Sequence, residues 1–337
     1  MNISYFKIYE QQNIDLHKRS QTWVVLGGKD NTKLLSKTYP VTPEGINYAF
    51  SEVKQLGDEY SVLIEPVCGW IWVVKQLREL GMDVYISNPR KIRMIAESLN
   101  KTDENDAYTL ARLQKTGEVA LSYECSPETR KHRSLSRERC FLIRIRSALK
   151  CRLESIVTRD GNHTFLNQLK NRTQIIVANN EVKIHQDAIA SIDLIIKQVE
   201  GQLEDTIQIS PDIKRLMTIP GIGAITASTI CAEVGDFKNF KKPENLASFA
   251  GLVPRERSSG GKQKLGGITH AGSPYLRYVL IETAMRVRDV KGTCSLYAFY
   301  KRIKTKSSPM KARVALARKI LTIIWYMMNK QQDYVAY

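Results

Sequence analysis

The sequence is poor in the residues that build disulfide frameworks and zinc sites. Its 337 residues include only six cysteines and five histidines, all widely scattered, and no two cysteines form a CxxC pair. A zinc ribbon and a cysteine-rich scaffold both need such residues at close spacing. We therefore expect neither, and we expect a reducing compartment.

Long apolar runs are also lacking. The N-terminal stretch MNISYFKIYEQQ has no apolar core of the kind that a signal peptide carries. The longest apolar run near the other end, residues 320–328, is too short to cross a bilayer. These two features predict a soluble cytoplasmic protein without a membrane partner.

Acidic residues are outnumbered. The chain has 34 Asp and Glu against 51 Lys and Arg, a net charge of +17, and residues 251–337 hold 17 of the cations and only 4 of the acids. The 43% apolar content excludes collagen-like, mucin-like and wholly disordered proteins. A solvated basic tail would carry the same charge, but Leu, Ile, Val, Trp and Tyr run through this stretch. We therefore favour a folded surface that binds nucleic acid.

The chain is long enough for more than one domain, and its pattern changes along its length. Short β-rich runs alternate with helical patterns in residues 1–118, which predicts an α/β layer domain. The strands are expected near residues 13–17, 22–27, 34–41, 61–66 and 83–88, and the helices near 42–55, 70–80, 90–98 and 104–114.

Residues 119–210 are predicted to form a helical coiled-coil region, and residues 211–337 a mainly α domain. Apolar residues repeat every seven positions in one segment and in steps of seven, three and four in another. The two seams pack either on each other within one monomer or between subunits, and we favour an arm that also pairs subunits. The seam residues are Leu135, Leu142, Leu149 and Ile156, then Val182, Ile189, Ile192, Ile196, Val199 and Leu203.

Four acids in the first region are candidate metal ligands. Asp15 lies in NIDLHK, Glu65 ends the apolar run SVLIE, and Asp103 and Asp106 lie three positions apart in KTDENDAYTLARL. Carboxylates gathered from strand ends and one helix face suit Mg²⁺, which prefers oxygen ligands and assists phosphodiester chemistry. Alternatively, Asp103 caps a helix and Glu65 is an ordinary surface acid. With these acids and this predicted order of strands and helices, the first region resembles a RuvC-like ribonuclease H fold.

The PGIG turn is a candidate site for a DNA backbone. Gly221 and Gly223 precede a helical pattern, and a Gly-x-Gly turn that enters a helix presents backbone N–H groups to a phosphate. The turn looks like a helix-hairpin-helix element. A tight turn that needs a positive φ would explain the glycines nearly as well.

The segment RERSSGGKQKLGG joins two serines, four glycines and four cations. A serine beside glycine can act as a nucleophile, and nearby Arg and Lys can stabilise an attacked phosphate. A flexible basic loop that only grips DNA has the same composition, and composition alone favours that alternative.

The motifs together resemble the IS110 family of bacterial insertion-sequence transposases, over about residues 10–330. The matching segments are IDLHK, EPVCGW, SNPRKIR, KTDENDA, IPGIGAITA, FAGLVPRERSSGG and GGITHAGSPYLR. Their order and spacing are far more specific than any one motif. The chain departs from the family pattern at His270, where a lysine is expected.

The resemblance implies a DNA transposase with a composite site. Asp15, Glu65, Asp103 and Asp106 would hold Mg²⁺, and Ser259, or the adjacent Ser258, would attack a phosphodiester and form a transient phosphoserine link. It also implies a noncoding bridge RNA that pairs with target and donor DNA, a homodimer or tetramer, and work at the bacterial nucleoid. Expected nucleic-acid contacts are Gly221, Gly223, Arg255, Arg257, Lys262, Lys264 and Arg277.

Two other functions fit parts of the sequence. A metal-dependent RuvC-like junction endonuclease would need the acids but not the serine. A non-catalytic nucleic-acid-binding protein would need neither. The intact set of acids and the complete C-terminal region favour the transposase.

Overall fold

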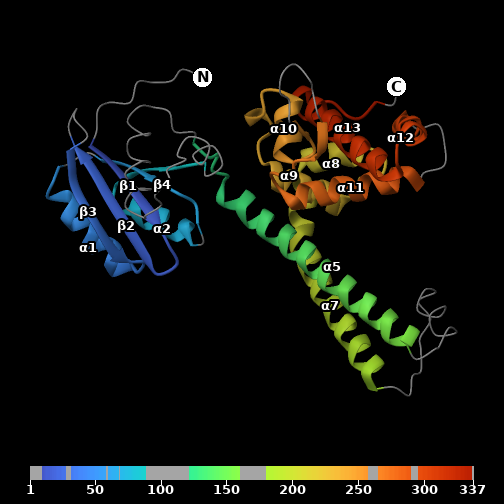
Figure 1. The fold of residues 1–337 in the computed structure, drawn as a ribbon, viewed down its shortest axis with the longest axis horizontal. Helices are drawn as coiled ribbons and strands as arrows, with labels where there is room; N and C mark the ends of the chain where they lie inside the picture. The colour runs from blue at the N-terminus through green and yellow to red at the C-terminus, as the bar shows by residue number, and fades with distance from the viewer. Residues whose placement is uncertain are drawn as a thin grey trace. The chain divides into compact units, whose positions relative to one another are not determined.

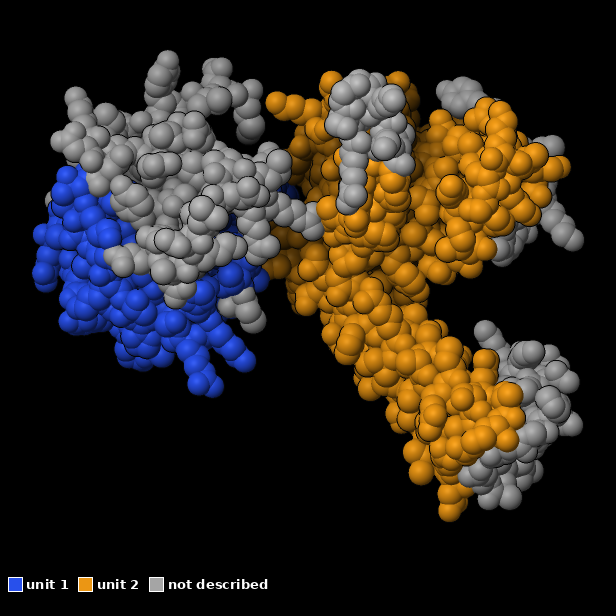
Figure 2. Space-filling model, in the orientation of Figure 1, with its two compact units in different colours: residues 1–124 blue, residues 125–337 orange. Residues whose placement is uncertain are grey.

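The computed structural model places most of the chain in two compact units, residues 1–124 and 125–337 (Figure 2). Most of the described residues are helical, and the sheets are small. The structure describes residues 10–27, 32–57, 60–67, 69–88, 121–159, 180–256, 265–289 and 295–335.

Unit 1 is built on a five-stranded sheet in the order β3-β2-β1-β4-β5 (Figure 1). β1 pairs antiparallel with β2, and β2 antiparallel with β3, whereas β4 pairs parallel with β1 and β5 parallel with β4. The expected order of three strands, helix, strand, helix and strand is confirmed. The bounds are β1 Glu10–Leu16, β2 Ser20–Gly27, β3 Thr32–Pro40, β4 Tyr60–Ile64 and β5 Asp83–Ile86.

Two described helices connect the later strands and supply the core of the unit. α1 (Pro43–Lys54) starts at Thr42, whose hydroxyl accepts from the Gly45 amide, and α2 (Trp70–Glu79) follows Gly69. Their apolar stripes pack on one face of the sheet in a single buried cluster. That cluster includes Ile14, Trp23, Val62, Ile64, Ile46, Ala49, Val53, Val74 and Leu77. The predicted helices at residues 90–98 and 104–114 lie outside the described residues.

Unit 2 begins with two long helices that lie side by side (Figure 1), α5 (Pro127–Arg159) and α7 (Asn180–Ile209). They run antiparallel, because Leu142 packs near Ile196 whereas Ile156 packs near Val182. Three ion pairs follow the same register, with N–O distances of 2.6, 2.7 and 3.0 Å. They are Arg139–Glu200, Arg146–Asp193 and Arg159–Glu181. The predicted seams therefore meet within one chain.

The remaining helices of unit 2 lie close together (Figure 1). They contribute to one large buried apolar cluster. Its centre is α13, whose Leu316, Ile320 and Ile324 are fully buried. Ser210 and Ser308 cap α8 and α13, each followed by a proline at the first helical position. The elements are α8 Pro211–Met217, α9 Ala224–Val234, η1 Phe237–Asn239, α10 Pro243–Phe249, β6 Pro254–Glu256, β7 Leu265–Ile268, α11 Pro274–Asp289, α12 Ser295–Lys306 and α13 Pro309–Lys330.

Candidate active site and nucleic-acid interface

Two of the predicted acids occupy adjacent positions in the sheet of unit 1. Ile14 of β1 lies opposite Ile64 of β4 in a parallel register, and both are fully buried. Asp15 is the next residue of β1, which ends at Leu16, and Glu65 directly follows β4, so the two acids lie near the carboxyl ends of neighbouring strands. Glu65 is partly exposed. Water therefore reaches Glu65, whereas the preceding Ile64 lies in the core, which excludes an unpaired charge.

The other two predicted ligands cannot be placed beside them. Asp103 and Asp106 lie outside the described residues, as does Lys101. Within the described ranges, no group of three or more His, Cys, Asp or Glu side chains is close enough to hold a metal ion. Carboxylates are the oxygen ligands that a hard divalent ion requires, so Asp15 and Glu65 would supply part of such a site. The four-acid cluster remains a prediction.

The PGIG turn joins α8 to α9, and its two glycines differ. Gly221 has φ +85°, and a Cβ there would lie 3.0 Å from Cγ2 of Val287 on α11, so both backbone conformation and close packing require glycine. Gly223 has φ −92°, is exposed, and leaves open space where a Cβ would be. It caps α9 without a side-chain hydrogen bond. Backbone conformation and packing together explain Gly221, and Gly223 remains a candidate phosphate contact.

The serine-bearing segment connects two short paired strands. β6 and β7 are antiparallel, with Pro254 opposite Ile268 and Glu256 opposite Leu265. Arg255 on β6 is exposed, as a phosphate contact must be. The predicted nucleophile Ser259, its neighbour Ser258 and the cations Arg257, Lys262 and Lys264 lie outside the described residues. The structure therefore describes the two strands that flank the candidate nucleophile.

Comparison with known proteins assigns the chain to a family. A family model described as "Transposase" of the DEDD IS110 type matches residues 13–159, and a model described as "Transposase IS116/IS110/IS902 family" matches residues 213–301. The chain belongs to the IS110/IS116/IS902 family of transposases. It is therefore a DNA transposase, an enzyme that cleaves and rejoins DNA strands, and its DEDD domain implies dependence on a divalent metal ion.

Curated relatives resemble this transposase over most of their lengths. The transposase for insertion sequence element IS1111A of Coxiella burnetii is 28% identical over 273 residues, 76% of this chain and 74% of the relative. A probable family 20 transposase of Pseudomonas aeruginosa is 26% identical, with 77% and 81% covered. A pilin gene-inverting protein of Moraxella bovis is 28% identical, with 74% of each chain covered.

The segments that flank β6 and β7 of the transposase are packed tightly together. Gly272 has φ +110°, and a Cβ there would lie 1.8 Å from the carbonyl oxygen of Phe249. Arg277 Nη1 donates to the carbonyl oxygens of Ala250, at 3.0 Å, and His270, at 3.3 Å. Arg277 thus braces the chain before β6 against the chain after β7. A phosphate contact at this guanidinium would have to coexist with both bonds.

The sequence did not predict a role for one buried carboxylate in this region, that of Glu233. Glu233 of α9 has a fully buried side chain, and its Oε2 accepts a 2.6 Å hydrogen bond from Ser273 Oγ. Ser273 Oγ also accepts from the Leu276 amide at 3.1 Å, so Ser273 caps α11. Arg137 of α5 donates from Nε at 2.6 Å and from Nη2 at 3.0 Å to the two oxygens of Glu233. The Glu233 hydrogen bonds raise the pKa of Arg137, although burial acts against this.

Further contacts attach α5 to the transposase domain. His132 Nε2 lies 2.6 Å from Ser228 Oγ, and Arg133 Nε donates to the carbonyl oxygen of Ala232 at 2.7 Å. The guanidinium of Arg137 also lies over the ring of Tyr275, 5.1 Å from its centroid. The start of α5 is therefore hydrogen-bonded to α9 and contacts the first turn of α11. The sequence signal was a single glutamate in the apolar helix ITASTICAEV.

Proposed function

We propose that this transposase excises and inserts an insertion sequence by DNA strand exchange at a composite site. In unit 1, Asp15, Glu65, Asp103 and Asp106 hold Mg²⁺, and in unit 2 Ser259 is the nucleophile. The observation that carries the proposal is the register of β1 and β4, because it brings Asp15 and Glu65 to the same edge of the sheet. The bound metal would activate the nucleophile and stabilise the leaving oxygen.

The fold of unit 1 supports the acidic site. Its first three strands are antiparallel, and β4 and β5 then add in parallel beside β1. We assign this arrangement to the RuvC-like ribonuclease H fold. In unit 2, the α8–PGIG–α9 segment serves as the helix-hairpin-helix element, with Gly223 toward the DNA backbone.

The serine step transfers a phosphoryl group from one oxygen to another. Ser259 Oγ forms a bond to phosphorus and loses its proton, while the bond to the leaving strand breaks and that strand leaves with a hydroxyl group after taking up a proton. The enzyme then carries the other strand as a phosphoserine, which a second strand hydroxyl attacks to reseal the DNA. Arg255, Arg257, Lys262 and Lys264 would stabilise the added negative charge.

Pairing of subunits would bring the serine of one chain to the acids of another. The predicted seams pack within one chain, so a dimer needs a different surface of the arm. α7 offers one, because Ile184 and Ile195 lie three helical turns apart and are 66% and 42% exposed. Leu194, 62% exposed, lies beside them. We propose that this face of α7 joins two subunits.

The family resemblance and the net charge of +17 support a bridge RNA as the further partner. Base pairing by that RNA would select the target and donor DNA, and the protein would bind the RNA mainly through its backbone. The proposed place of action is the nucleoid in the bacterial cytoplasm.

A trapping assay tests the mechanism. Protein, Mg²⁺, the candidate RNA and element-end DNA are incubated and denatured, and a covalent protein–DNA adduct is sought. We expect Ser259→Ala and Asp106→Ala to abolish the adduct and Ser258→Ala to preserve it. Asp83→Asn is the matched control, because Asp83 is exposed at the amino end of β5, the opposite end of the sheet from Glu65.

The alternative functions give different results in the same assay. DNA cleavage that survives Ser259→Ala without any adduct would identify a metal-dependent junction nuclease that uses water. Binding without cleavage, unchanged when all four acids are replaced, would identify a non-catalytic nucleic-acid-binding protein.

A further inference from the structure

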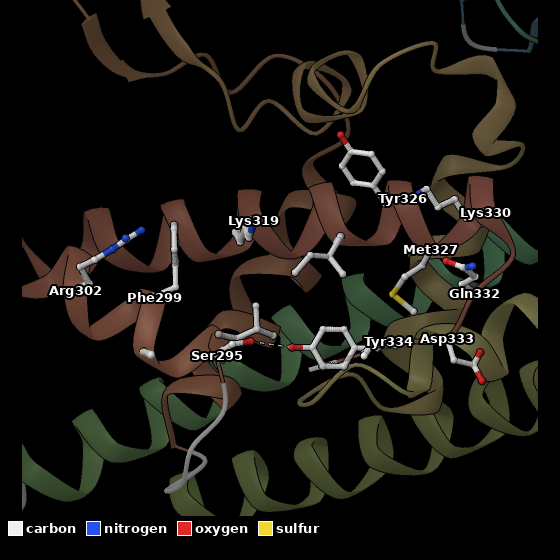
Figure 3. A pocket seen from close by; sticks show the side chains of 14 residues that line it. Ser295, Phe299, Arg302, Lys319, Tyr326, Met327, Lys330, Gln332, Asp333 and Tyr334 are labelled. Atoms are coloured by element: carbon white, nitrogen blue, oxygen red, sulfur yellow. Dashed lines mark hydrogen bonds between the residues drawn. The ribbon is translucent and has the colours of Figure 1, made fainter. Parts of the chain in front are cut away.

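α12, α13 and the chain that follows α13 line an open cavity of about 830 Å³ (Figure 3). Its apolar lining includes Leu296 and Phe299 from α12 and Ile323 and Met327 from α13. Leu296 and Met327 are buried, and Phe299 and Ile323 are partly exposed, so apolar surface remains open to a ligand. A pocket of this size suits a small molecule or one or two units of a polymer.

The chain after α13 is hydrogen-bonded to the start of α12 and to the end of α8 where it lines the cavity. The Tyr334 hydroxyl lies 3.3 Å from the Ser295 hydroxyl across the pocket, as Figure 3 shows. The Tyr334 amide donates to Thr218 Oγ1 at 2.9 Å, which ties this segment to the end of α8. The cavity is thus preformed, with defined walls from three parts of unit 2.

The rim of the cavity is cationic. Arg302, Lys319 and Lys330 line it and are all exposed, and the single lining carboxylate, Asp333, lies 3.9 Å from Arg215. Residues 295–335 contain nine Lys and Arg but one acid. An apolar peptide would gain nothing from this charge, whereas a phosphate-linked ligand would. Arg302 also lies over the Phe299 ring, 5.4 Å from its centroid, at the pocket wall.

We propose that this pocket binds an unpaired nucleotide of a nucleic-acid strand. The base enters the apolar cavity beside Phe299, Ile323 and Met327, and the adjoining phosphates contact the cations at the rim. Aromatic and apolar walls under a basic rim are the usual means of holding single strands without reading sequence. A base pair inside a duplex stays stacked and cannot enter such a cavity, so the ligand must be unpaired.

This inference rests on the proposed function, which supplies two sources of unpaired nucleotides. One is a DNA strand released on cleavage, and the other is a single-stranded part of a guide RNA. Either source gives the same chemistry, a base joined to a phosphate. The pocket would hold that strand at a place formed by α12, α13 and the C-terminal segment, separate in the chain from Ser259.

Crosslinking to the full-length protein tests the inference without requiring catalysis. DNA and RNA strands of eight nucleotides that contain 5-iodouracil are irradiated with the protein. The crosslinked amino acids are then mapped by mass spectrometry. We expect crosslinks at Phe299 or Tyr334 with single strands and none with a duplex of the same sequence. Comparison of the DNA and RNA strands shows which source the pocket prefers.

Two variants and a matched control distinguish binding in the pocket from general attraction to positive charge. Ala298 is an exposed lining residue, so Ala298→Trp fills the cavity without removing a contact. We expect Ala298→Trp and Lys319→Glu each to weaken single-strand binding about tenfold, the range expected for loss of one stacked base or its phosphate contact. Lys304→Glu changes charge equally at an exposed α12 residue outside the lining, and we expect less than about a twofold effect.

Any one of three results would overturn the inference. These are equal crosslinking by duplex and single strand, crosslinks only outside the pocket, or equal effects of Lys319→Glu and Lys304→Glu with none from Ala298→Trp. None of these depends on strand exchange, and loss of the phosphoserine adduct with Ser259→Ala does not depend on the pocket. Failure of the pocket and failure of the proposed chemistry are therefore distinguishable.

Discussion

Replacement of Ser273 by alanine should destabilise the C-terminal unit more than removal of an ordinary helix cap. Ser273 caps α11 and also donates a 2.6 Å hydrogen bond to the buried Glu233 carboxylate. Ser308 caps α13 in the same way through the Lys311 amide, but it is exposed. Both serines are followed by proline at the first helical position, so Ser308→Ala is a matched control.

The expected difference follows from these contacts. Loss of a serine cap costs about 1 kcal/mol at either position. At Ser273, loss of a hydrogen bond to a buried ionised group adds about 1.5–3 kcal/mol, because Glu233 keeps only its bonds to Arg137. We therefore expect the free energy of unfolding to fall by about 2.5–4 kcal/mol for Ser273→Ala and by about 1 kcal/mol for Ser308→Ala.

Hydrogen exchange in increasing urea can measure this difference in the full chain. Peptides from α9 report only on unit 2, because α9 belongs to its central apolar cluster. Equal losses of stability for the two variants would refute the reasoning, since they would show that the Ser273–Glu233 bond contributes nothing. The Glu233→Gln variant and the combined Glu233→Gln and Ser273→Ala variant then complete a double-mutant cycle, which gives the coupling energy of the two side chains.

Three further predictions follow from the structure. Gly272→Ala should destabilise unit 2 by several kcal/mol in thermal melts, because its Cβ would overlap the Phe249 carbonyl oxygen, whereas Gly267→Ala, with open space, should change stability by less than about 1 kcal/mol. Burial lowers the pKa of His132 below its ordinary 6.5, so the unfolded chain takes up a proton first as the pH falls. Stability should hold above about pH 6.5 and decline below it, and His132→Gln should flatten that decline in unfolding measured from pH 5 to 8. DNA affinity should fall at least about a hundredfold between 50 and 200 mM salt, and Arg255→Ala should reduce the slope of log affinity against log salt by about 1. Equal melts for the two glycine variants, a pH profile that His132→Gln leaves unchanged, or a flat salt profile would contradict these predictions.

Local patterns in the sequence were enough for the elements of the fold. Alternation of strand and helix patterns predicted the order of the elements in unit 1, because the periodicity of apolar residues is set by residues close together in the chain. Heptad spacing predicted both long helices, and Leu142, Ile156, Val182 and Ile196 are indeed buried between them. The same spacing could not decide whether the seams meet within or between chains, because both arrangements bury the same stripe.

The candidate site, too, could be predicted only in part from the sequence. The apolar run SVLI before Glu65 and the segment NIDLHK around Asp15 indicated these two acids in the sequence, since a strand core resists an unpaired charge. Their adjacency depends on the parallel register of β1 and β4, which joins residues about fifty positions apart. No local pattern fixes such a register, because it depends on packing of the whole sheet.

The tertiary structure alone decided the role of residues that look ordinary in sequence. Glu233 meets Ser273, 40 residues later, and Arg137, 96 residues earlier. Gly221 and Gly272 need glycine because distant backbone or side-chain atoms occupy the space of a Cβ. The sequence by itself determined the charge, the helices, the strands and the motifs, because these arise from neighbouring residues. Partners for buried polar groups and the walls of the α12–α13 pocket come from chain segments that meet only after folding.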